Sequence, residues 1–431
     1  MICLLPNCCF LSETSRMLEL YRALQERGAA VRVALHGGPH EQVLGDAGVS
    51  YDRIGGGMSA ERCAAFVRSL PGIGPPDQSM WTDEELRDYA EAEAAYFRSH
   101  GVRVAVTGWT LTALLSTRLA GIPLVTEHAG SCVPPVFERG LLPVPSRPVG
   151  IPGERWLPEP VRRRLFNRGL TRLTIYTAGF NRVAGELGVE GVPSFPALLL
   201  GDLTLVTDVP ELLGVSRTEL DSWKPRDSSR YRSGTRLRYT GPLFAKLSTP
   251  VPERVERFLA RPGGTVYVAI TSSTADLVRG VVAALRPLGL DILVAATVHD
   301  LSDLEDEQVL VEGVLPSHEI MPSVELAVTA GGQGSVQTAL ASGVPLIGIP
   351  LQPEQDANVA FAQRQGAARL VPQDAANTEA LADTAKTMLA DGRCRDAARR
   401  VQALFARVDG PGASADAILE LLGDGASRRA A

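Results

Sequence analysis

Three glycines and a serine fall within five residues in the second half of the chain, at Gly331, Gly332, Gly334 and Ser335. Glycine has no Cβ, so the backbone there can come close to a ligand, and the N–H groups at the start of a following helix point at it. The helix dipole favours an anion at that place. The hydroxyl of Ser335 can cap the helix or donate to a phosphate. The turn is therefore typical of a phosphate or diphosphate site.

The elements that must position this turn form a βαβ unit. We expect a strand at Leu326–Thr329, a helix at Val336–Ser342 that ends at Gly343, and a second strand at Leu346–Ile349. The crossover between two such parallel strands is right-handed. Glycine-rich turns also occur in α/β proteins that bind no phosphate, and the spacing here is not that of the dinucleotide fingerprint. The turn alone leaves both interpretations open.

A longer pattern of fixed spacing extends from the turn to Asn358. Its members are Gly331, Gly332, Gly334, Ser335, Gly343-Val344-Pro345, Pro350, Glu354-Gln355 and Asn358. The pattern resembles the donor-binding signature of family 1 glycosyltransferases, which are nucleotide-sugar-dependent enzymes with the GT-B fold, and in particular that of bacterial natural-product glycosyltransferases. The resemblance implies that sugar hydroxyls are bound by Glu354 and Gln355. It also implies that the donor phosphates are bound by Ala330, Gly331, Gly332, Gln333, Gly334 and Ser335.

Two positions depart from the family pattern. Ala330 stands where the family has a histidine that helps to hold the donor phosphates, and Thr338 stands where it has an acidic residue. Ala330 removes one phosphate contact and leaves the backbone N–H groups. A weaker site, a site for a different donor and an inactive site are all compatible with these changes.

The same resemblance extends to two other strand ends. The apolar strand expected at 265–270 is followed by Ser272 and Ser273, which match the family's second phosphate contact. Leu315 and Pro316 match the segment that meets the nucleobase, largely through backbone groups. The aromatic residue that often stacks on the base is replaced by Val314, so we expect weaker stacking or none.

The N-terminal half opens with another βαβ pattern, which resembles the acceptor-binding domain of the same family. In an open parallel sheet, ligands bind outside the carboxyl ends of the strands. That rule selects three loops, at Cys9–Ser15, Gly108–Thr112 and Glu127–Cys132. Phe10 and Trp109 lie in these loops, and we expect both to contact the acceptor.

The catalytic base is not at its usual place. Transfer with inversion needs a base that takes the proton of the acceptor hydroxyl, and the family carries a histidine for this role in the first loop. This sequence has none there. Glu13 and His128 are the titratable groups in the three loops that suit the role. Each also has a structural interpretation, as an acid favoured by a helix N-terminus and as a histidine satisfied at a strand end.

Eight prolines lie between 134 and 160, and this density predicts neither a helix nor a central strand. We interpret the segment as a flap over the acceptor pocket, with Phe137 and Trp156 as apolar contacts. A plain surface connection is the alternative. Beyond it, residues 162–187 are expected to be helical.

Length and composition bound the class of protein. The chain has 431 residues, 45% of them hydrophobic and 21% charged, with a formal net charge of −6. This size predicts two domains, and the charge argues against nucleic-acid binding. The six cysteines lack a zinc spacing, and no apolar run is long enough for a membrane span. We therefore expect a cytoplasmic protein, for which a homodimer is compatible with the sequence.

The expected fold is α/β, of the GT-B type, with two Rossmann-like domains that face each other across a cleft. We place the acceptor-binding domain at 1–221, a polar linker at 222–238 and the donor-binding domain at 239–410. A terminal helix that returns to the first domain and a disordered tail would occupy 411–431.

The expected function is that of an inverting glycosyltransferase that moves a hexose from a UDP- or TDP-sugar to a small, partly apolar acceptor of natural-product type. The nucleotide sugar is a co-substrate, and no cofactor is expected. No Asp-x-Asp cluster suited to a metal occurs, so we expect metal independence. Two alternatives stay open: a catalytically degenerate protein that acts as a binding or auxiliary partner, and a nucleotide-sugar epimerase.

Overall fold

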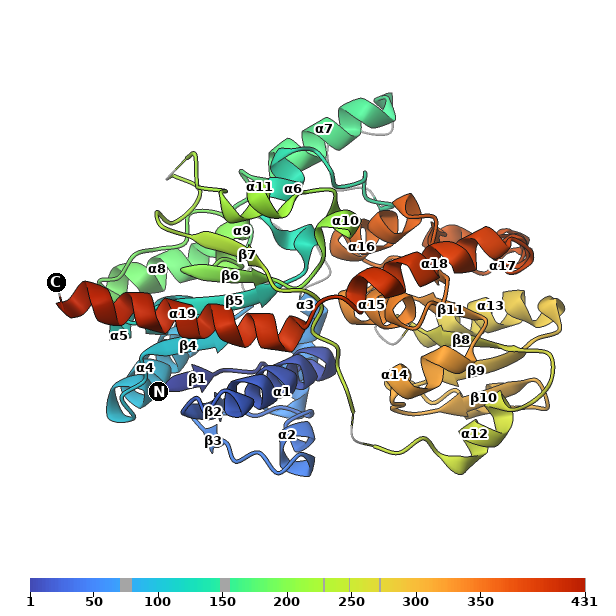
Figure 1. Cartoon of the computed structure of the whole chain (residues 1–431), viewed down its shortest axis with the longest axis horizontal. Coiled ribbons are helices and arrows are strands. Elements are labelled where there is room, and N and C mark those ends of the chain that lie inside the picture. The colour runs from blue at the N-terminus through green and yellow to red at the C-terminus, as the bar shows by residue number, and fades with distance from the viewer. Residues whose placement is uncertain (70–79, 148–155, 228, 248, 271–272, 431) are drawn as a thin grey trace. The chain divides into compact units, whose positions relative to one another are not determined.

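A computed structural model describes residues 1–69, 80–147, 156–227, 229–247, 249–270 and 273–430 (Figure 1). It contains two parallel sheets, of 7 and 6 strands, which confirms the predicted α/β class. The chain divides into two compact units. Unit 1 comprises Met1–Leu141, Arg155–Ala245 and Val408–Ala431, and unit 2 comprises Leu142–Glu154 and Lys246–Arg407.

The sheet of unit 1 has the strand order β3-β2-β1-β4-β5-β6-β7, and every neighbouring pair is parallel. Because the order reverses between β1 and β4, the loops after these strands flank a switch point, where open α/β sheets bind ligands. The strands are β1 (Ile2–Leu4), β2 (Val31–Leu35), β3 (Asp52–Arg53), β4 (Val104–Thr107), β5 (Leu124–His128), β6 (Leu203–Val206) and β7 (Arg236–Tyr239).

Alternating residues of these buried strands point to opposite faces of the sheet, and each face packs into its own hydrophobic core. Ile2 and Leu4 pack with α1 and α19, whereas Cys3 and Leu5 pack with α4, α5 and α8 on the other face. The helices of unit 1 are α1 (Leu11–Glu26), α2 (Gln42–Asp46), α3 (Ala60–Ser69), α4 (Asp83–Ser99), α5 (Ala113–Ala120), α6 (Pro134–Glu138), α7 (Glu159–Leu170), α8 (Thr177–Leu187), α9 (Phe195–Leu198), α10 (Pro210–Leu213), α11 (Arg217–Asp221) and α19 (Gly410–Ala430).

The sheet of unit 2 has the order β10-β9-β8-β11-β12-β13, again all parallel. Its switch point lies between β8 and β11. The strands are β8 (Thr265–Ala269), β9 (Asp291–Ala295), β10 (Val309–Glu312), β11 (Leu326–Thr329), β12 (Leu346–Gly348) and β13 (Ala368–Leu370). The helices are α12 (Glu253–Leu259), α13 (Ala275–Leu285), α14 (Ser317–Ile320), α15 (Gln333–Ala341), α16 (Pro353–Arg364), α17 (Glu379–Ala390) and α18 (Gly392–Phe405).

Short 3-10 turns complete the connections. They are Gly130–Cys132, Arg286–Leu288, Ser302–Leu304, Met321–Ser323 and Gln373–Ala375.

Three expectations about the helices of unit 1 are wrong. α1 begins at Leu11, inside the loop expected at Cys9–Ser15, so Glu13 lies in the first turn of a helix. α6 is a helix inside the proline-rich segment, with proline at its first positions, where the missing N–H costs nothing and the fixed φ suits the helix. The helix expected at 162–187 is two helices, α7 and α8, separated by a turn in which Tyr176 has φ +67°.

The predicted domain limits also differ from the observed units. The sequence predicts a linker at 222–238 and the second domain from 239. In the structure β7 pairs with β6, so residues 236–239 belong to the sheet of unit 1. Unit 2 begins at Lys246. At the C-terminus, α19 continues to Ala430, so a helix occupies the end of the range 411–431, where a disordered tail is expected from the sequence.

Candidate active site

The glycine turn lies between β11 and α15 in unit 2. β11 ends at Thr329, Gly332 is the N-cap, and Gln333 is the first helical residue. The helix therefore begins three residues earlier than predicted, and Gln333, Gly334 and Ser335 form its first turn. N–H groups in the first turn of an α-helix have no acceptor within the helix, so they point outward at the carboxyl edge of the sheet. This is the arrangement that favours an anion.

Gly331 can be replaced by no other residue without strain. Its φ is +86°, and a Cβ added there would lie 2.5 Å from Cγ2 of Val359 and 3.1 Å from the backbone oxygen of Gln355. The N–H of Gly331 donates to Oγ1 of Thr329 at 3.0 Å, and its carbonyl accepts from Nδ2 of Asn358 at 3.1 Å. The turn is thereby fixed directly against α16.

The acidic and amide residues of α16 also hold one another. Nδ2 of Asn358 donates to Oε1 of Glu354 as well as to Gly331, and Oε1 of Gln355 accepts from the N–H of Leu351 at 2.7 Å. Gln355 and Asn358 are buried. The structure thus brings Glu354 and Gln355 beside the glycine turn, and it uses part of their hydrogen-bonding capacity to shape the loop after β12.

Two more loops reach the same edge of this sheet. β8 pairs with β11, so Ser273, which follows β8, is on the neighbouring strand end; Ser272 lies outside the described residues. The Ser273 hydroxyl donates to the carbonyl of Ile270 at 2.7 Å, and its own carbonyl meets Nε2 of His299 at 2.7 Å. In this conformation the hydroxyl of Ser273 already donates its proton to a backbone carbonyl.

Leu315 and Pro316 follow β10 and are buried, whereas Val314 is 49% exposed. Ala330 is also buried, and its methyl group belongs to the apolar core of unit 2. The position where the family has a histidine is therefore filled by a core side chain here.

In unit 1, Glu13 joins the two loops that flank the switch point. Its Oε1 accepts from the N–H groups of Asn7 at 3.2 Å, Gly108 at 3.1 Å and Trp109 at 2.8 Å. The side chain is fully buried, and Oε2 has no hydrogen-bond partner. Burial raises the pKa of Glu13 to about 8, opposed by the hydrogen bond from Trp109 and by the charge of Arg16.

A second buried carboxyl group, Glu127 of β5, lies beside Glu13. A Cβ added to Gly108 would be 2.8 Å from Oε1 of Glu127 and 3.1 Å from Oε1 of Glu13, so both carboxyl groups need a glycine between them. Nε of Arg16 donates to Oε1 of Glu127 at 2.9 Å. The positive charge of Arg16 thus lies near both buried carboxyl groups. Burial raises the pKa of Glu127 as well.

His128 is the last residue of β5, at the carboxyl edge of the sheet. Burial and, to a smaller extent, the charge of Arg16 lower its pKa to about 3. The ring is hydrogen-bonded to the backbone of Leu199, whereas its Nε2 is buried without a partner. The neutral imidazole therefore carries its proton on Nδ1 and presents a lone pair at Nε2.

A chain of aromatic contacts begins at this histidine. The centroid of the Trp109 ring lies 5.9 Å from that of His128 and 6.2 Å from that of Phe10, which in turn lies 6.0 Å from Phe66. Of the residues that the sequence predicts for acceptor contact or catalysis, the structure thus brings together Phe10, Glu13, Trp109 and His128.

The other two predicted acceptor contacts lie elsewhere in unit 1. Phe137 is buried in α6, and Trp156, just before α7, is 77% exposed. Nothing in these surroundings places either ring with Phe10 and Trp109.

Sequence reasoning missed a buried polar pair at the same edge. Nε2 of His36, which follows β2, lies 2.7 Å from Oε1 of Glu93 in α4, and its Nδ1 lies 2.9 Å from the carbonyl of Ile54. His36 lines a small pocket with Asn7 and Thr110. The two partners are 57 positions apart, so no local pattern could have joined them.

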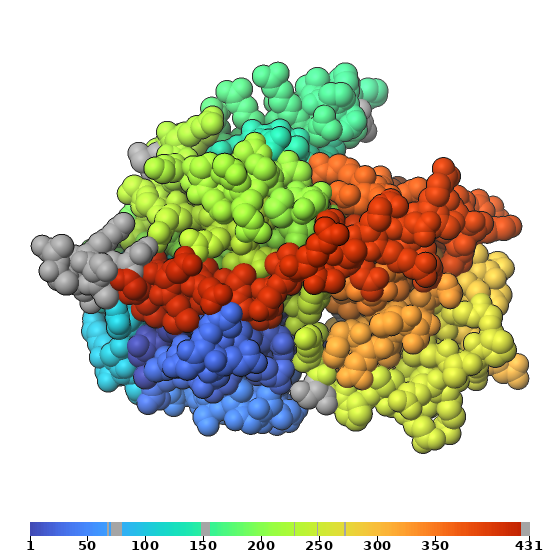
Figure 2. Space-filling view, viewed as in Figure 1, coloured from blue at the N-terminus to red at the C-terminus, as the bar shows by residue number. Residues whose placement is uncertain are grey.

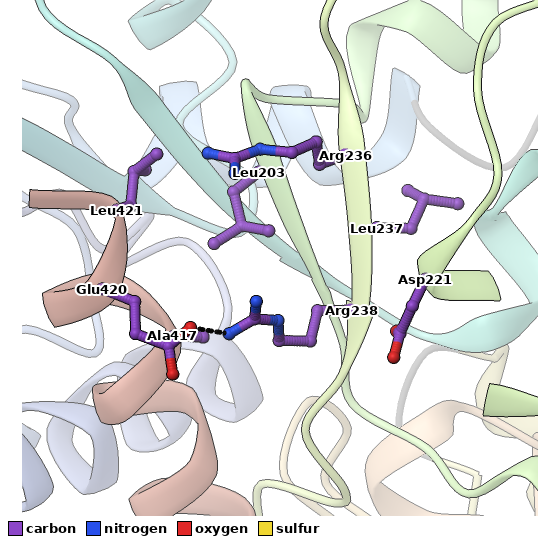
Figure 3. Close-up of a pocket in the computed structure, with 8 residues that line it drawn as sticks. All are labelled: Leu203, Asp221, Arg236, Leu237, Arg238, Ala417, Glu420 and Leu421. Atoms are coloured by element: carbon purple, nitrogen blue, oxygen red, sulfur yellow. Dashed lines mark hydrogen bonds and ion pairs between the residues drawn. The ribbon is translucent and has the colours of Figure 1, made fainter. Parts of the chain in front are cut away.

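Another pocket lies between β7 and α19 (Figure 3). Leu203 and Arg236 are the first residues of β6 and β7, so this pocket is at the amino ends of the strands, away from the switch point. Arg238 forms an ion pair with Glu420 across it. Its position does not fit the ligand site of a parallel sheet.

Two findings limit the chemistry of the described ranges. Histidine, cysteine, aspartate and glutamate side chains do not gather there in groups of three that could hold a metal ion. Within the same ranges, no helix has both the length and the hydrophobicity needed to cross a membrane.

Comparison with known proteins assigns the class. Residues 280–421 match the C-terminal domain of the family described as erythromycin biosynthesis protein CIII-like. A PGL/p-HBAD biosynthesis glycosyltransferase of Mycobacterium tuberculosis is 26% identical over 330 residues, which cover 76% of this chain and 72% of that protein. The chain is a GT-B glycosyltransferase of the natural-product type.

Solved structures of the same fold cover nearly the whole chain. The glycosyltransferase VinC in complex with dTDP has a TM-score of 0.66 and 16% identity, over 98% of this chain and 100% of that chain. The spinosyn rhamnosyltransferase SpnG, complexed with spinosyn aglycone, has a TM-score of 0.62 and 17% identity, over 97% and 99%. These similarities agree with the predicted GT-B fold.

Proposed function

We propose that the chain transfers a hexose, with inversion, from a UDP- or TDP-sugar to a hydroxyl of a small, partly apolar acceptor. The acceptor oxygen forms a bond to the anomeric carbon while the bond to the diphosphate breaks. The hydroxyl proton passes to a base, and the nucleoside diphosphate leaves. The observation that carries this proposal is the glycine turn before Gln333, fixed against α16 at the switch point of the second sheet.

The donor half of the proposal is supported by the first turn of α15. Outward N–H groups and the Ser335 hydroxyl suit a diphosphate, and dipoles fixed before the reaction stabilise charge that develops on the leaving group. Such dipoles can supply this stabilisation without a metal ion. VinC, which has the same fold, was solved with dTDP.

The acceptor half is supported by the surroundings of His128. The His128 ring packs against the Trp109 ring, which in turn packs against Phe10, and these aromatic rings suit a partly apolar acceptor. We assign the base to His128 and not to Glu13, because Nε2 of His128 carries a lone pair without a partner, whereas burial raises the pKa of Glu13 to about 8 and keeps it mostly protonated at neutral pH. Glu13 then acts as a positioning residue for both loops. SpnG was solved with an aglycone.

The experiment is titration calorimetry with UDP and TDP, followed by transfer assays over phenolic and macrolide acceptors with a panel of UDP- and TDP-hexoses. We expect a nucleoside diphosphate to bind, and the matching nucleoside without phosphates to bind much more weakly. Transfer would then identify the sugar and the acceptor. If neither diphosphate binds, the proposed donor site is wrong. Binding without turnover of any donor would instead favour a degenerate binding protein, as Ala330, Thr338 and the missing histidine of the first loop would suggest.

A further inference from the structure

Apolar side chains are exposed together at one helix of unit 1. Within the described residues, five large hydrophobic side chains are exposed, and three of them lie on α7 or just before it. They are Trp156 at 77%, Val161 at 43% and Leu165 at 42% exposure. Val161 and Leu165 are four residues apart, so they share a helix face. Exposed apolar groups that cluster in this way mark an interaction surface.

The same helix carries a dense positive charge. Arg163, Arg164 and Arg168 are all exposed. The acidic residue of α7 is Glu159, in its first turn. The whole chain has a net charge of −6, so this basic surface is a local departure from the composition.

α7 is attached to unit 1 by little of its surface. Phe166 and Asn167 are its buried residues, and α6 is the element with which it makes its main contacts. Figure 1 shows the helix extending away from the sheet beyond α6, and Figure 2 shows its side chains standing out into solvent.

We propose that α7, with Trp156, docks on the surface of an anionic lipid bilayer. Arg164 and Arg168 lie three residues after Val161 and Leu165 and so flank this apolar pair. A helix with arginines beside aliphatic side chains lies in the plane of a membrane interface, with its apolar groups among the acyl chains and its arginines at the headgroups. Charge complementarity favours anionic lipids over a second copy of this chain. A two-fold dimer through α7 would bring Arg163, Arg164 and Arg168 against themselves.

Docking of this kind would hold the enzyme where partly apolar acceptors are concentrated. It needs no membrane-spanning segment. The inference rests on Trp156 and on the exposed residues of α7. It is therefore independent of the donor site and of the catalytic base.

The first test is co-sedimentation with vesicles of phosphatidylcholine that contain phosphatidylglycerol, and with vesicles of phosphatidylcholine alone. We expect binding to the anionic vesicles at low salt, weaker binding as salt is added, and little binding to the neutral vesicles. The triple variant R163E/R164E/R168E should lower the partition coefficient at least about 100-fold, since each arginine near an anionic surface accounts for roughly fivefold.

The matched control exchanges three exposed arginines of unit 2, in the variant R257E/R393E/R400E. It changes the net charge by the same amount, and we expect it to bind vesicles nearly as the wild type does. Equal losses in the two triple variants would show only a general charge effect and would overturn the proposal. So would the absence of vesicle binding at low salt.

A second readout follows the apolar side chains. The double variant V161S/L165S should weaken binding to anionic vesicles about tenfold, by removing buried apolar area. Tryptophan emission should shift to the blue on adding these vesicles, and W156F should abolish that shift. An unchanged shift in W156F would overturn the insertion of this face, and binding to an acidic protein surface but not to vesicles would assign α7 to a protein partner instead.

Discussion

At the scale of single residues, the switch point of unit 1 contains one arginine and two buried carboxyl groups, and the protonation of the carboxyl groups sets the net charge of this cluster. Arg16 pairs with Glu127, and Glu13 receives backbone N–H groups from both neighbouring loops. With a pKa of about 8, Glu13 is mostly protonated at neutral pH, so the cluster is nearly neutral inside the protein.

Glu13→Gln should flatten the pH dependence of the free energy of unfolding. The folded pKa of about 8 is above the unfolded value near 4.5, so the folded state binds an extra proton between these two values. Stability linked to Glu13 is therefore complete below about pH 4.5 and is lost as the pH rises to 8, by up to about 1.4 kcal/mol per pH unit. Glutamine resembles the protonated acid and cannot titrate.

Urea unfolding between about pH 5 and 9 measures this effect. The wild type should lose a few kcal/mol more than Glu13→Gln does over the range. The exposed Glu91 gives the matched control, since Glu91→Gln should keep the wild-type slope. Parallel curves for wild type and Glu13→Gln would show that Glu13 is ionised throughout.

His128→Ala should lower turnover at least about 100-fold, the low end of the contribution of a general base. The substitution removes the Nε2 lone pair, and nucleotide affinity should stay unchanged because His128 belongs to unit 1. Steady-state transfer rates and calorimetry measure the two effects separately. His100→Ala, at the end of α4, is the control. Normal turnover in His128→Ala would place the base elsewhere.

At the scale of elements, the sequence predicts the strands of unit 2 well and the helix starts poorly. Leu326–Thr329 is observed as predicted, because central parallel strands are continuous apolar runs. α15 begins earlier than predicted, and α1 begins inside the loop expected at Cys9–Ser15, because Phe10 and Gly332, their N-caps, make no side-chain cap hydrogen bond that would mark the boundary.

The candidate site was predictable only where it is local in the sequence. The turn around Gly331 and its partner Asn358 follow from a compact motif, and the structure brings the two together. The contact of Arg16 with Glu127 spans 111 positions and has no local signal. The burial of Glu13 and of His128 and the partners of each side chain follow from packing that no pattern in one sequence reveals.

Gly331→Ala should weaken the binding of UDP or TDP at least about tenfold, which corresponds to 1.4 kcal/mol. The added methyl group meets Cγ2 of Val359 at 2.5 Å, and φ of +86° is strained for alanine, so the turn must move. Calorimetry measures the change. Val359→Ala in the same chain should restore part of the affinity by making room.

The matched control for that substitution is Gly392→Ala, in the same unit, where an added Cβ meets nothing within 4 Å. It should bind nucleotide as the wild type does. If Gly331→Ala also bound normally, the diphosphate would have to lie away from the turn.

At the scale of the whole molecule, each unit has its own parallel sheet and its own buried core, so ligands of one unit need not stabilise the other. A ligand that binds only the folded form of unit 2 lowers the equilibrium population of its unfolded form by a factor of 1 + [L]/Kd. At a hundred times Kd this factor is about 100, or about 2.7 kcal/mol.

Hydrogen exchange followed by mass spectrometry should therefore show unequal protection on adding nucleoside diphosphate. We expect amides in the buried strands of unit 2 that exchange by unfolding of the whole unit to slow by up to about 100-fold. Amides in the first turn of α15 should be protected directly, through contact with the phosphates. Those of β1, β4 and β5 in unit 1 should change far less. Equal slowing in both units would mean that they unfold as one cooperative body, and protection confined to unit 1 would place the nucleotide on the wrong sheet.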